Sequence, residues 1–201
     1  YTDTLGVCLN LYSPRKFFGV PDGCYVIGEN AERFLDGYEQ DFSSGTSSFL
    51  MKRIEYGSDA IYHERMKNEE RIDNSDVLKM SILTKALLNN IDYSIIKSKR
   101  QENFKIAHDL YKKLNRIDPI RFMDDKSVPM VYPLVIEDKE LAVKLKLKGI
   151  YTGRWWTSVL SEVPEKSFEA WLSQNLLPMP IDQRYNSNEL LVCYQILRDL
   201  I

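Results

Sequence analysis

The chain is poor in the residues that build metal centres and nucleophile–base pairs. Its 201 residues include only two histidines and three cysteines, and no two cysteines have C-x-x-C spacing. A zinc centre or a Ser/His triad would have almost no ligands or bases to use, so we expect no metal site. Cys8, Cys24 and Cys193 lie in apolar contexts, which predicts buried, reduced thiols of a cytoplasmic protein. His63 and His108 fall in charged helical stretches and are expected to be exposed.

The chain also lacks an excess of charge of either sign. Lysine and arginine number 27 against 29 aspartates and glutamates, for a formal net charge of -2. Such a balance gives no long-range field for nucleic acid or an anionic membrane. No apolar run of the sequence is long enough to span a bilayer, and we expect no signal peptide. We therefore expect neither a nucleic-acid nor a membrane partner. The first residues run straight into an apolar segment, which predicts that an N-terminal half of the fold lies upstream.

The first half of the chain predicts a hairpin followed by helices. Two short apolar runs flank a turn rich in glycine and proline, the pattern of a β-hairpin with Lys16 near its tip. A Ser/Gly-rich loop, a charged helical stretch, a cap signal and an amphipathic helix follow. The expected positions are 5–11 and 24–27 for the strands, 43–48 for the loop, 49–72 for the charged stretch, 74–76 for the cap and 78–89 for the helix.

The second half predicts a small α+β domain. Asp118-Pro119 should end a long helix, and a β-rich run follows it. The segment 141–149 alternates like a strand, but its leucine spacing and Gly149 favour a helix. Asn186 and Glu189 form a possible capping box for a terminal helix. The expected helices are 93–115, 141–149, 168–172 and the terminal one, and the expected strands are 128–136, 150–156 and 176–181.

Lys16 is the most informative residue. It lies between an apolar run and a stretch of aromatic and glycine residues, at Pro14-Arg15-Lys16-Phe17-Phe18. A lysine in an apolar setting loses hydration, and its pKa falls toward values at which the neutral amine is a nucleophile. Schiff-base chemistry needs such an amine. The alternative is a lysine without a catalytic role, whose aliphatic chain packs along the two phenylalanines while its ammonium group stays in water.

Residues 14–27 resemble the cofactor-lysine segment of fold-type-I pyridoxal-phosphate enzymes, and more narrowly that of the DegT/StrS sugar aminotransferases. The shared pattern is Pro-x-Lys, a glycine, an Asp-Gly turn and an apolar strand. The order of later segments also agrees: Met80-Ser81 opening a helix, then a Val-Pro-x-x-Tyr-Pro-Leu strand at 128–134, and Leu-Pro-x-Pro at 177–180. The resemblance covers most of the chain, and the lysine segment is its specific part.

The resemblance implies an α/β large domain that binds pyridoxal 5'-phosphate, followed by a small α+β domain. Residues 1–50 would be the remnant of the large domain, 51–92 a charged helical connector and 93–201 the small domain. Lys16 would bind the cofactor covalently and move protons, and the hydroxyl of Ser13 would bond its phosphate. The family transfers an amino group, usually from glutamate, to a keto-sugar nucleotide, and works as a cytoplasmic homodimer.

Two arginines of the second half are weaker candidates for binding a sugar nucleotide or amino acid substrate. Arg154 lies beside Trp155-Trp156, where a guanidinium could hold a carboxylate or phosphate or simply stack on an aromatic ring. Arg184 lies in a polar cluster that either faces a site or caps the terminal helix. The alternative for the whole chain is a non-catalytic module that keeps the fold and has a structural or interaction role.

Overall fold

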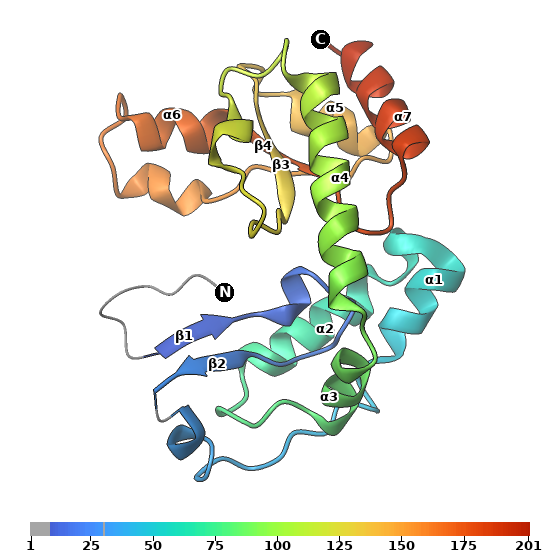
Figure 1. The fold of residues 1–201 in the computed structure, drawn as a ribbon, viewed down its shortest axis with the longest axis vertical. Coiled ribbons are helices and arrows are strands. Elements are labelled where there is room, and N and C mark those ends of the chain that lie inside the picture. Colours follow the sequence, from blue (N-terminus) through green and yellow to red (C-terminus); the bar gives the residue numbers. More distant parts are fainter. Residues whose placement is uncertain (1–8, 30) are drawn as a thin grey trace. The chain divides into compact units, whose positions relative to one another are not determined.

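The chain divides into two compact units, Tyr1–Ile91 and Asp92–Ile201 (Figure 1). The computed structural model describes residues 9–29 and 31–201. The division falls one residue before the predicted boundary at 92/93. The expected domain remnant, 1–50, and the expected separate connector, 51–92, fall in one unit, except for Asp92, which begins the second.

The first unit begins with a β-hairpin and continues with three helices. The two strands pair antiparallel, with Leu9 opposite Gly28 and Tyr12 opposite Tyr25. The hairpin is thus confirmed, although residues 5–8 of its expected first strand lie outside the described part. The charged stretch is helical, as its pattern predicted, and forms two helices. The elements are β1 Leu9–Tyr12, η1 Pro14–Lys16, β2 Tyr25–Gly28, η2 Ala31–Phe34, α1 Ser48–Ala60, α2 Tyr62–Asp73 and α3 Ile82–Asn89.

The helix α3 begins later than the sequence suggested. Its N-cap is Ser81, whose hydroxyl accepts a hydrogen bond from the backbone N–H of Thr84. The prediction of a cap at 74–76 is wrong, because the hydroxyl of Ser75 instead donates to the carbonyl of Ile72 at the end of α2. A serine satisfies the free N–H groups of a helix only from the position directly before it.

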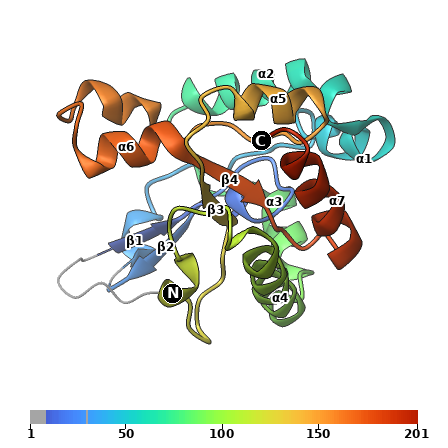
Figure 2. The ribbon, with the colours of Figure 1, turned by 90° about the horizontal axis from the view of Figure 1, so that it is seen from above.

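The second unit packs helices around a second antiparallel strand pair. Val131 lies opposite Pro180 and Val135 opposite Leu176. The helices α4 and α7 lie side by side, and η4 packs on α6 (Figures 1 and 2). Leu176–Pro180 is a strand despite its two prolines. The elements are α4 Tyr93–Tyr111, η3 Pro119–Phe122, β3 Val131–Val135, α5 Leu141–Leu147, η4 Thr157–Ser161, α6 Phe168–Asn175, β4 Leu176–Pro180 and α7 Ser187–Arg198.

Local signals explain the helix ends of this unit. Asn186 and Glu189 form the predicted capping box at the start of α7. Gly149, at φ +83, follows the end of α5 in the left-handed conformation that glycine adopts without strain, and the helix predicted there is confirmed. The strand expected at 150–156 is wrong, because that segment is irregular and leads into η4.

The main hydrophobic core lies in the second unit. It brings together α4, β3, α5, β4 and α7, and centres on three tilted or edge-on aromatic contacts around Tyr132 and Tyr111. His108 packs at its margin with its Nδ1 3.4 Å from the Tyr132 hydroxyl, so the expectation of an exposed His108 is wrong. His63 is exposed, as predicted. Burial raises the pKa of Tyr111 far above its ordinary value, which keeps its hydroxyl neutral.

Helices and two small antiparallel sheets place the described chain among mixed, α+β-type proteins. The expectation that the first unit is the end of a larger α/β domain stays a prediction. Within the described ranges, no helix has both the length and the apolar character needed to cross a membrane.

Candidate functional site

Lys16 ends the short helix η1, which lies in the connection between β1 and β2. Pro14 opens this turn and is buried, and the N–H groups of Phe17 and Phe18 both donate to its carbonyl at 2.9 Å. The rings of Phe17 and Phe18 are half-buried, whereas the Lys16 side chain is exposed. The expectation of a lysine buried among apolar neighbours is therefore wrong for this chain. The exposure of the amine does not test whether Lys16 binds a cofactor covalently, so that role stays a prediction.

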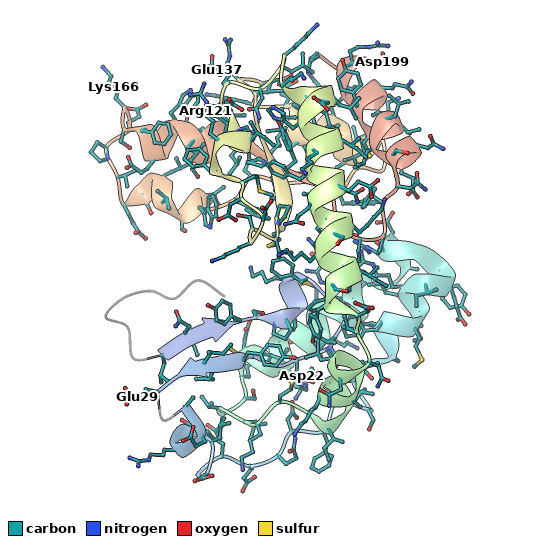
Figure 3. The ribbon with its side chains drawn as sticks, viewed as in Figure 1. Asp22, Glu29, Arg121, Glu137, Lys166 and Asp199 are labelled. Atoms are coloured by element: carbon teal, nitrogen blue, oxygen red, sulfur yellow. The ribbon has the colours of Figure 1, made fainter. Side chains whose placement is uncertain are left out.

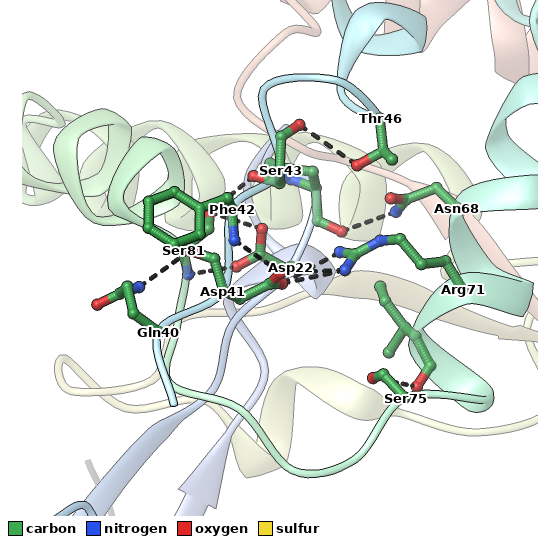
Figure 4. A network of polar contacts seen from close by, with 12 residues as sticks. Asp22, Gln40, Asp41, Phe42, Ser43, Thr46, Asn68, Arg71, Ser75 and Ser81 are labelled. Atoms are coloured by element: carbon green, nitrogen blue, oxygen red, sulfur yellow. Dashed lines mark hydrogen bonds and ion pairs between the residues drawn. The ribbon is translucent and has the colours of Figure 1, made fainter. Parts of the chain in front are cut away.

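A buried carboxylate fixes the other end of the connection. Asp22 is 5% exposed and accepts hydrogen bonds from the Ser81 N–H at 2.9 Å, the Ser81 hydroxyl at 2.7 Å and the Thr84 hydroxyl at 3.0 Å. Ser81 gives its one hydroxyl hydrogen to Asp22, so Ser43 is the donor in the 2.7 Å contact between the two serines. Figure 4 shows this network, and Figure 3 shows Asp22 inside the unit while Glu29 lies at its edge.

Helix α2 holds the same connection from a second direction. Asn68, which is buried, donates through Nδ2 to the carbonyl of Pro21 at 2.8 Å. Arg15 pairs with Glu69 at 2.8 Å. These contacts tie both flanks of Lys16 to one helix, so the backbone that carries the amine is fixed.

A third contact anchors the loop that precedes α1. Arg71 of α2 makes a forked pair with Asp41, with Nη1–Oδ1 and Nη2–Oδ2 distances of 3.1 and 3.2 Å (Figure 4). Two parallel N–H···O bonds of this kind fix direction as well as distance. The segment around Asp41 therefore keeps its place next to the Asp22 network.

A cleft of about 370 Å³ opens beside this network. Its lining includes Ser13, Arg15 and Cys24 from the first part of the chain and residues 72 and 75–80. Lys16 is not among its lining residues. Ser13 and Lys16 are joined by a backbone hydrogen bond from the Lys16 N–H to the Ser13 carbonyl, at 3.3 Å. The structure thus places the two cofactor candidates in one turn, with only the serine facing the cleft.

The cysteines differ from expectation. Cys24 is exposed directly before β2, whereas a buried thiol was predicted. Cys193 is half-buried in α7, where burial and the charge of Glu189 raise the pKa of its thiol. Cys8 lies outside the described residues. Neither described thiol is in a disulfide.

The two arginine candidates belong to the second unit, and each is bound within it. Arg184 makes a forked pair with Asp182 at 2.7 and 2.8 Å, next to the start of α7. Burial raises the pKa of Asp182, but the Arg184 hydrogen bonds and charge outweigh it, and the net pKa is lowered. Arg154 donates through Nη2 to the carbonyl of Asp138 at 2.6 Å. A stacking role for Arg154 on its neighbouring tryptophans stays a prediction.

Sequence reasoning missed the residues that hold the Arg184 loop. Asn103 of α4, fully buried, donates through Nδ2 to the carbonyls of Ile181, Asp182 and Tyr185 at 3.0 to 3.2 Å. No local pattern in α4 marks this asparagine, because its partners lie about 80 positions away. An asparagine on the apolar side of a long helix is the only signal that the sequence offers.

Arg100, about one turn earlier in α4, also holds the 181–185 loop. It is 2% exposed, its Nε donates to Gln183 at 2.8 Å, and its Nη1 donates to the carbonyls of Pro129 and Met130 at 3.1 and 3.0 Å. Burial lowers its pKa, and the charge of Asp182 opposes that shift. In the sequence, Arg100 is a single arginine in line with the apolar residues of a long helix, and nothing near it indicates its partners. The structure shows that it is a buried link between α4, the 181–185 loop and the two residues that precede β3.

The Asp-Gly turn gives a test of this local geometry. Gly23 has φ +100, and a Cβ atom there would lie 2.8 Å from Cε of Met80. We expect Gly23→Ala to lower the free energy of unfolding of the first unit by about 2 kcal/mol, through backbone strain and crowding of Met80. Hydrogen exchange of the β2 and α3 amides measures this. Gly37→Ala is the control, because a Cβ at Gly37 meets nothing within 4 Å. Equal protection in both variants would contradict the account of the turn.

No known family, no curated protein and no solved structure matched this chain in the comparisons.

Proposed function

We propose that this chain carries the Schiff-base lysine, Lys16, of a pyridoxal-phosphate-dependent aminotransferase. The enzyme would be a cytoplasmic homodimer of the DegT/StrS type, with glutamate as amino donor and a keto-sugar nucleotide as acceptor. One observation carries the proposal. Lys16 presents an exposed amine at the end of η1, on a connection whose two flanks are anchored by buried contacts of Pro14 and Asp22. Covalent cofactor binding requires an accessible amine on a fixed backbone.

The residues around Lys16 fit the cofactor in part. They supply the amine and, in Ser13, a hydroxyl with no side-chain cap bond to its own turn. Lys16 would bind the carbonyl carbon of the cofactor and take up or release a proton at Nζ, while the Ser13 hydroxyl would donate to the phosphate. When bound, pyridoxal phosphate supplies the electron sink for the amino-group transfer. Contacts to its ring face and pyridine nitrogen would come from residues beyond this turn, including those of a second copy.

A non-catalytic role is the second candidate, and one observation favours it. Lys16 does not line the cleft beside it, and Arg154 and Arg184 already donate hydrogen bonds to residues of the second unit. We expect these features in a module that kept the fold but lost the catalytic activity, since its lysine and arginines would no longer need to bind a cofactor or a substrate. The two functions differ in whether Lys16 reacts with the cofactor.

Substituting the lysine separates them. We expect the protein to develop the visible absorbance of a lysine-bound cofactor when mixed with pyridoxal phosphate, and Lys16→Ala to lose that absorbance almost entirely. Lys85→Ala is the matched control, since Lys85 is an exposed lysine of the same unit, on α3. If Lys16→Ala keeps the band, or if both variants lose it equally, the aminotransferase proposal is wrong.

A further inference from the structure

The cleft beside the Asp22 network has a buried charge without a counter-ion. Asp22 is 5% exposed and is one of the residues that line this cavity of about 370 Å³. Its hydrogen-bond donors belong to Ser81 and Thr84, and none of them carries a formal charge. Among the described residues, Asp22 forms no ion pair. Buried charges in proteins are ordinarily paired or bind a metal, so a carboxylate of this kind beside a cavity favours a cation there.

The Asp22 carboxylate also has room for a further hydrogen bond. A carboxylate offers about four acceptor positions, and here Oδ2 accepts two hydrogen bonds and Oδ1 accepts one. All three donors come from Ser81 and Thr84, at the start of α3, and they hold the carboxylate in one orientation (Figure 4). The remaining acceptor position on Oδ1 is therefore fixed before any ligand binds.

Two other charged residues of the lining are already neutralised. Arg15 pairs with Glu69 at 2.8 Å, and Asp41 pairs with Arg71 at 3.1 Å. Neither Glu69 nor Arg71 lines the cleft, so each pair directs its interaction away from the cavity. These two lining residues therefore neither supply the missing counter-ion of Asp22 nor offer a free charge to a ligand.

The remaining charges of the lining make the cleft negative. Asp22 and Asp76 contribute two negative charges and Lys79 contributes one positive charge, for a net charge of -1. Neither Asp76 nor Lys79 forms an ion pair with another described residue. The lining thus favours a cation over an anion, and Lys79 is expected to weaken that preference.

The rest of the lining indicates an organic cation. Apolar side chains of Ile72, Leu78 and Met80 form part of the wall. The volume lies at the lower end of the range of about 300–1,000 Å³ for small-molecule sites, which combine apolar walls with a few fixed polar groups. In the part of the chain that the structure describes, no three His, Cys, Asp or Glu side chains gather as a metal site.

We propose that this cleft binds a small aliphatic amine as its ammonium ion. The ammonium group donates a hydrogen bond to Asp22, and the alkyl chain lies along Ile72, Leu78 and Met80. A diamine gains further attraction from Asp76. The inference goes beyond the proposed function, because neither pyridoxal phosphate nor Lys16, which does not line the cleft, takes part in it.

Titration of the whole protein with 1,4-diaminobutane at constant low ionic strength, followed by amide NMR, tests the proposal. We expect saturable shifts of residues 22–24 and 75–81. Butylamine should bind at least threefold more weakly, and butanol and butyrate at least tenfold more weakly, because they lack the positive charge. Nα-acetyl-lysine methylamide presents the same ammonium group on a peptide. It should bind more weakly than butylamine if the ligand is a free amine.

Three variants separate a ligand site from a structural role of the carboxylate. Asp22→Asn, with its fold checked by the amide spectrum, should bind the diamine about tenfold more weakly, since the charged hydrogen bond is lost. Asp76→Asn, at an exposed position, should reduce the affinity for the diamine to that for butylamine. Lys79→Met should bind both amines at least twofold more tightly, because it removes the repulsion and keeps the aliphatic chain. Asp36→Asn is the control, an exposed carboxylate outside the lining.

Several results would overturn the inference. These are no binding of either amine, equal binding of butyrate, tighter binding of the blocked lysine than of the diamine, and unchanged affinity in Lys79→Met or in a folded Asp22→Asn. Because Lys79→Met leaves the Asp22 network intact, the test does not depend on the stability of the Asp22 variant. Lys16→Ala should bind the diamine normally, which separates this result from any failure of the aminotransferase proposal.

Discussion

Replacing Asp22 with alanine is expected to destabilise the first unit by about 3 kcal/mol or more, since each hydrogen bond to a buried charged group contributes about 1.5–3 kcal/mol. The substitution leaves the Ser81 N–H and the hydroxyls of Ser81 and Thr84, both fully buried residues, without their shared acceptor. The cap of α3 loses support at the same time, because the capping hydroxyl of Ser81 is one of those groups.

Two further variants serve as comparisons for Asp22→Ala. Asp22→Asn keeps one acceptor oxygen and the shape, and its amide can donate to hydroxyl oxygens, so it should cost roughly half as much as alanine. Asp36→Ala removes an exposed carboxylate of the same unit and should change little. Because all tryptophans lie in the second unit, hydrogen exchange of residues 9–28 and 82–89 is the suitable measurement. Equal protection in the alanine and asparagine variants would contradict the assigned role of the Asp22 carboxylate.

Asn103→Asp is expected to be the most destabilising single change in the second unit, by about 4 kcal/mol at neutral pH, as for an uncompensated buried charge. The amide of Asn103 donates to three carbonyls, and a carboxylate in its place would face three acceptors with no hydrogen to give. Burial and these carbonyls would raise the pKa of the new carboxyl in the folded state. The charge-dependent part of the penalty should then be absent below the unfolded-state pKa of about 3.9 and grow as the pH rises from there to the folded-state value.

Denaturant unfolding followed by tryptophan fluorescence measures this effect at pH 4 and pH 7. Asn103→Ala loses the hydrogen bonds without adding charge, so we expect a loss of about 2 kcal/mol that does not depend on pH. Asn188→Asp makes the same chemical change at the exposed start of α7 and should be neutral or slightly stabilising. A pH-independent loss in Asn103→Asp would show that repulsion of the carboxylate is not the cause.

Signals confined to a few neighbouring residues predicted the structure well. Asn186 and Glu189 lie three positions apart, and the capping box they form needs nothing beyond that spacing. The leucine spacing and Gly149 predicted the helix at 141–149, and both are local signals. The hairpin around Lys16 followed from two apolar runs and one turn for the same reason.

Features that depend on distant partners escaped prediction. The burial of Asp22 requires Ser81 and Thr84, about 60 positions away, although the sequence alone shows only a turn residue. Residues 150–156 have the aromatic and β-branched content of a strand, yet Ser173 holds the end of that segment in an irregular conformation. The apolar neighbours of Lys16 suggested burial, but Phe17 and Phe18 take up the half-buried positions and leave the lysine exposed.

The central claim is that Lys16 reacts with pyridoxal phosphate as a specific site. Reduction of the cofactor-treated protein with borohydride, followed by digestion and mass spectrometry, locates the lysine that carries the cofactor. We predict that at low cofactor excess the label is found on the peptide containing Lys16 and is nearly absent from exposed lysines such as Lys85. Label spread evenly over the exposed lysines, or missing from Lys16, would contradict the account.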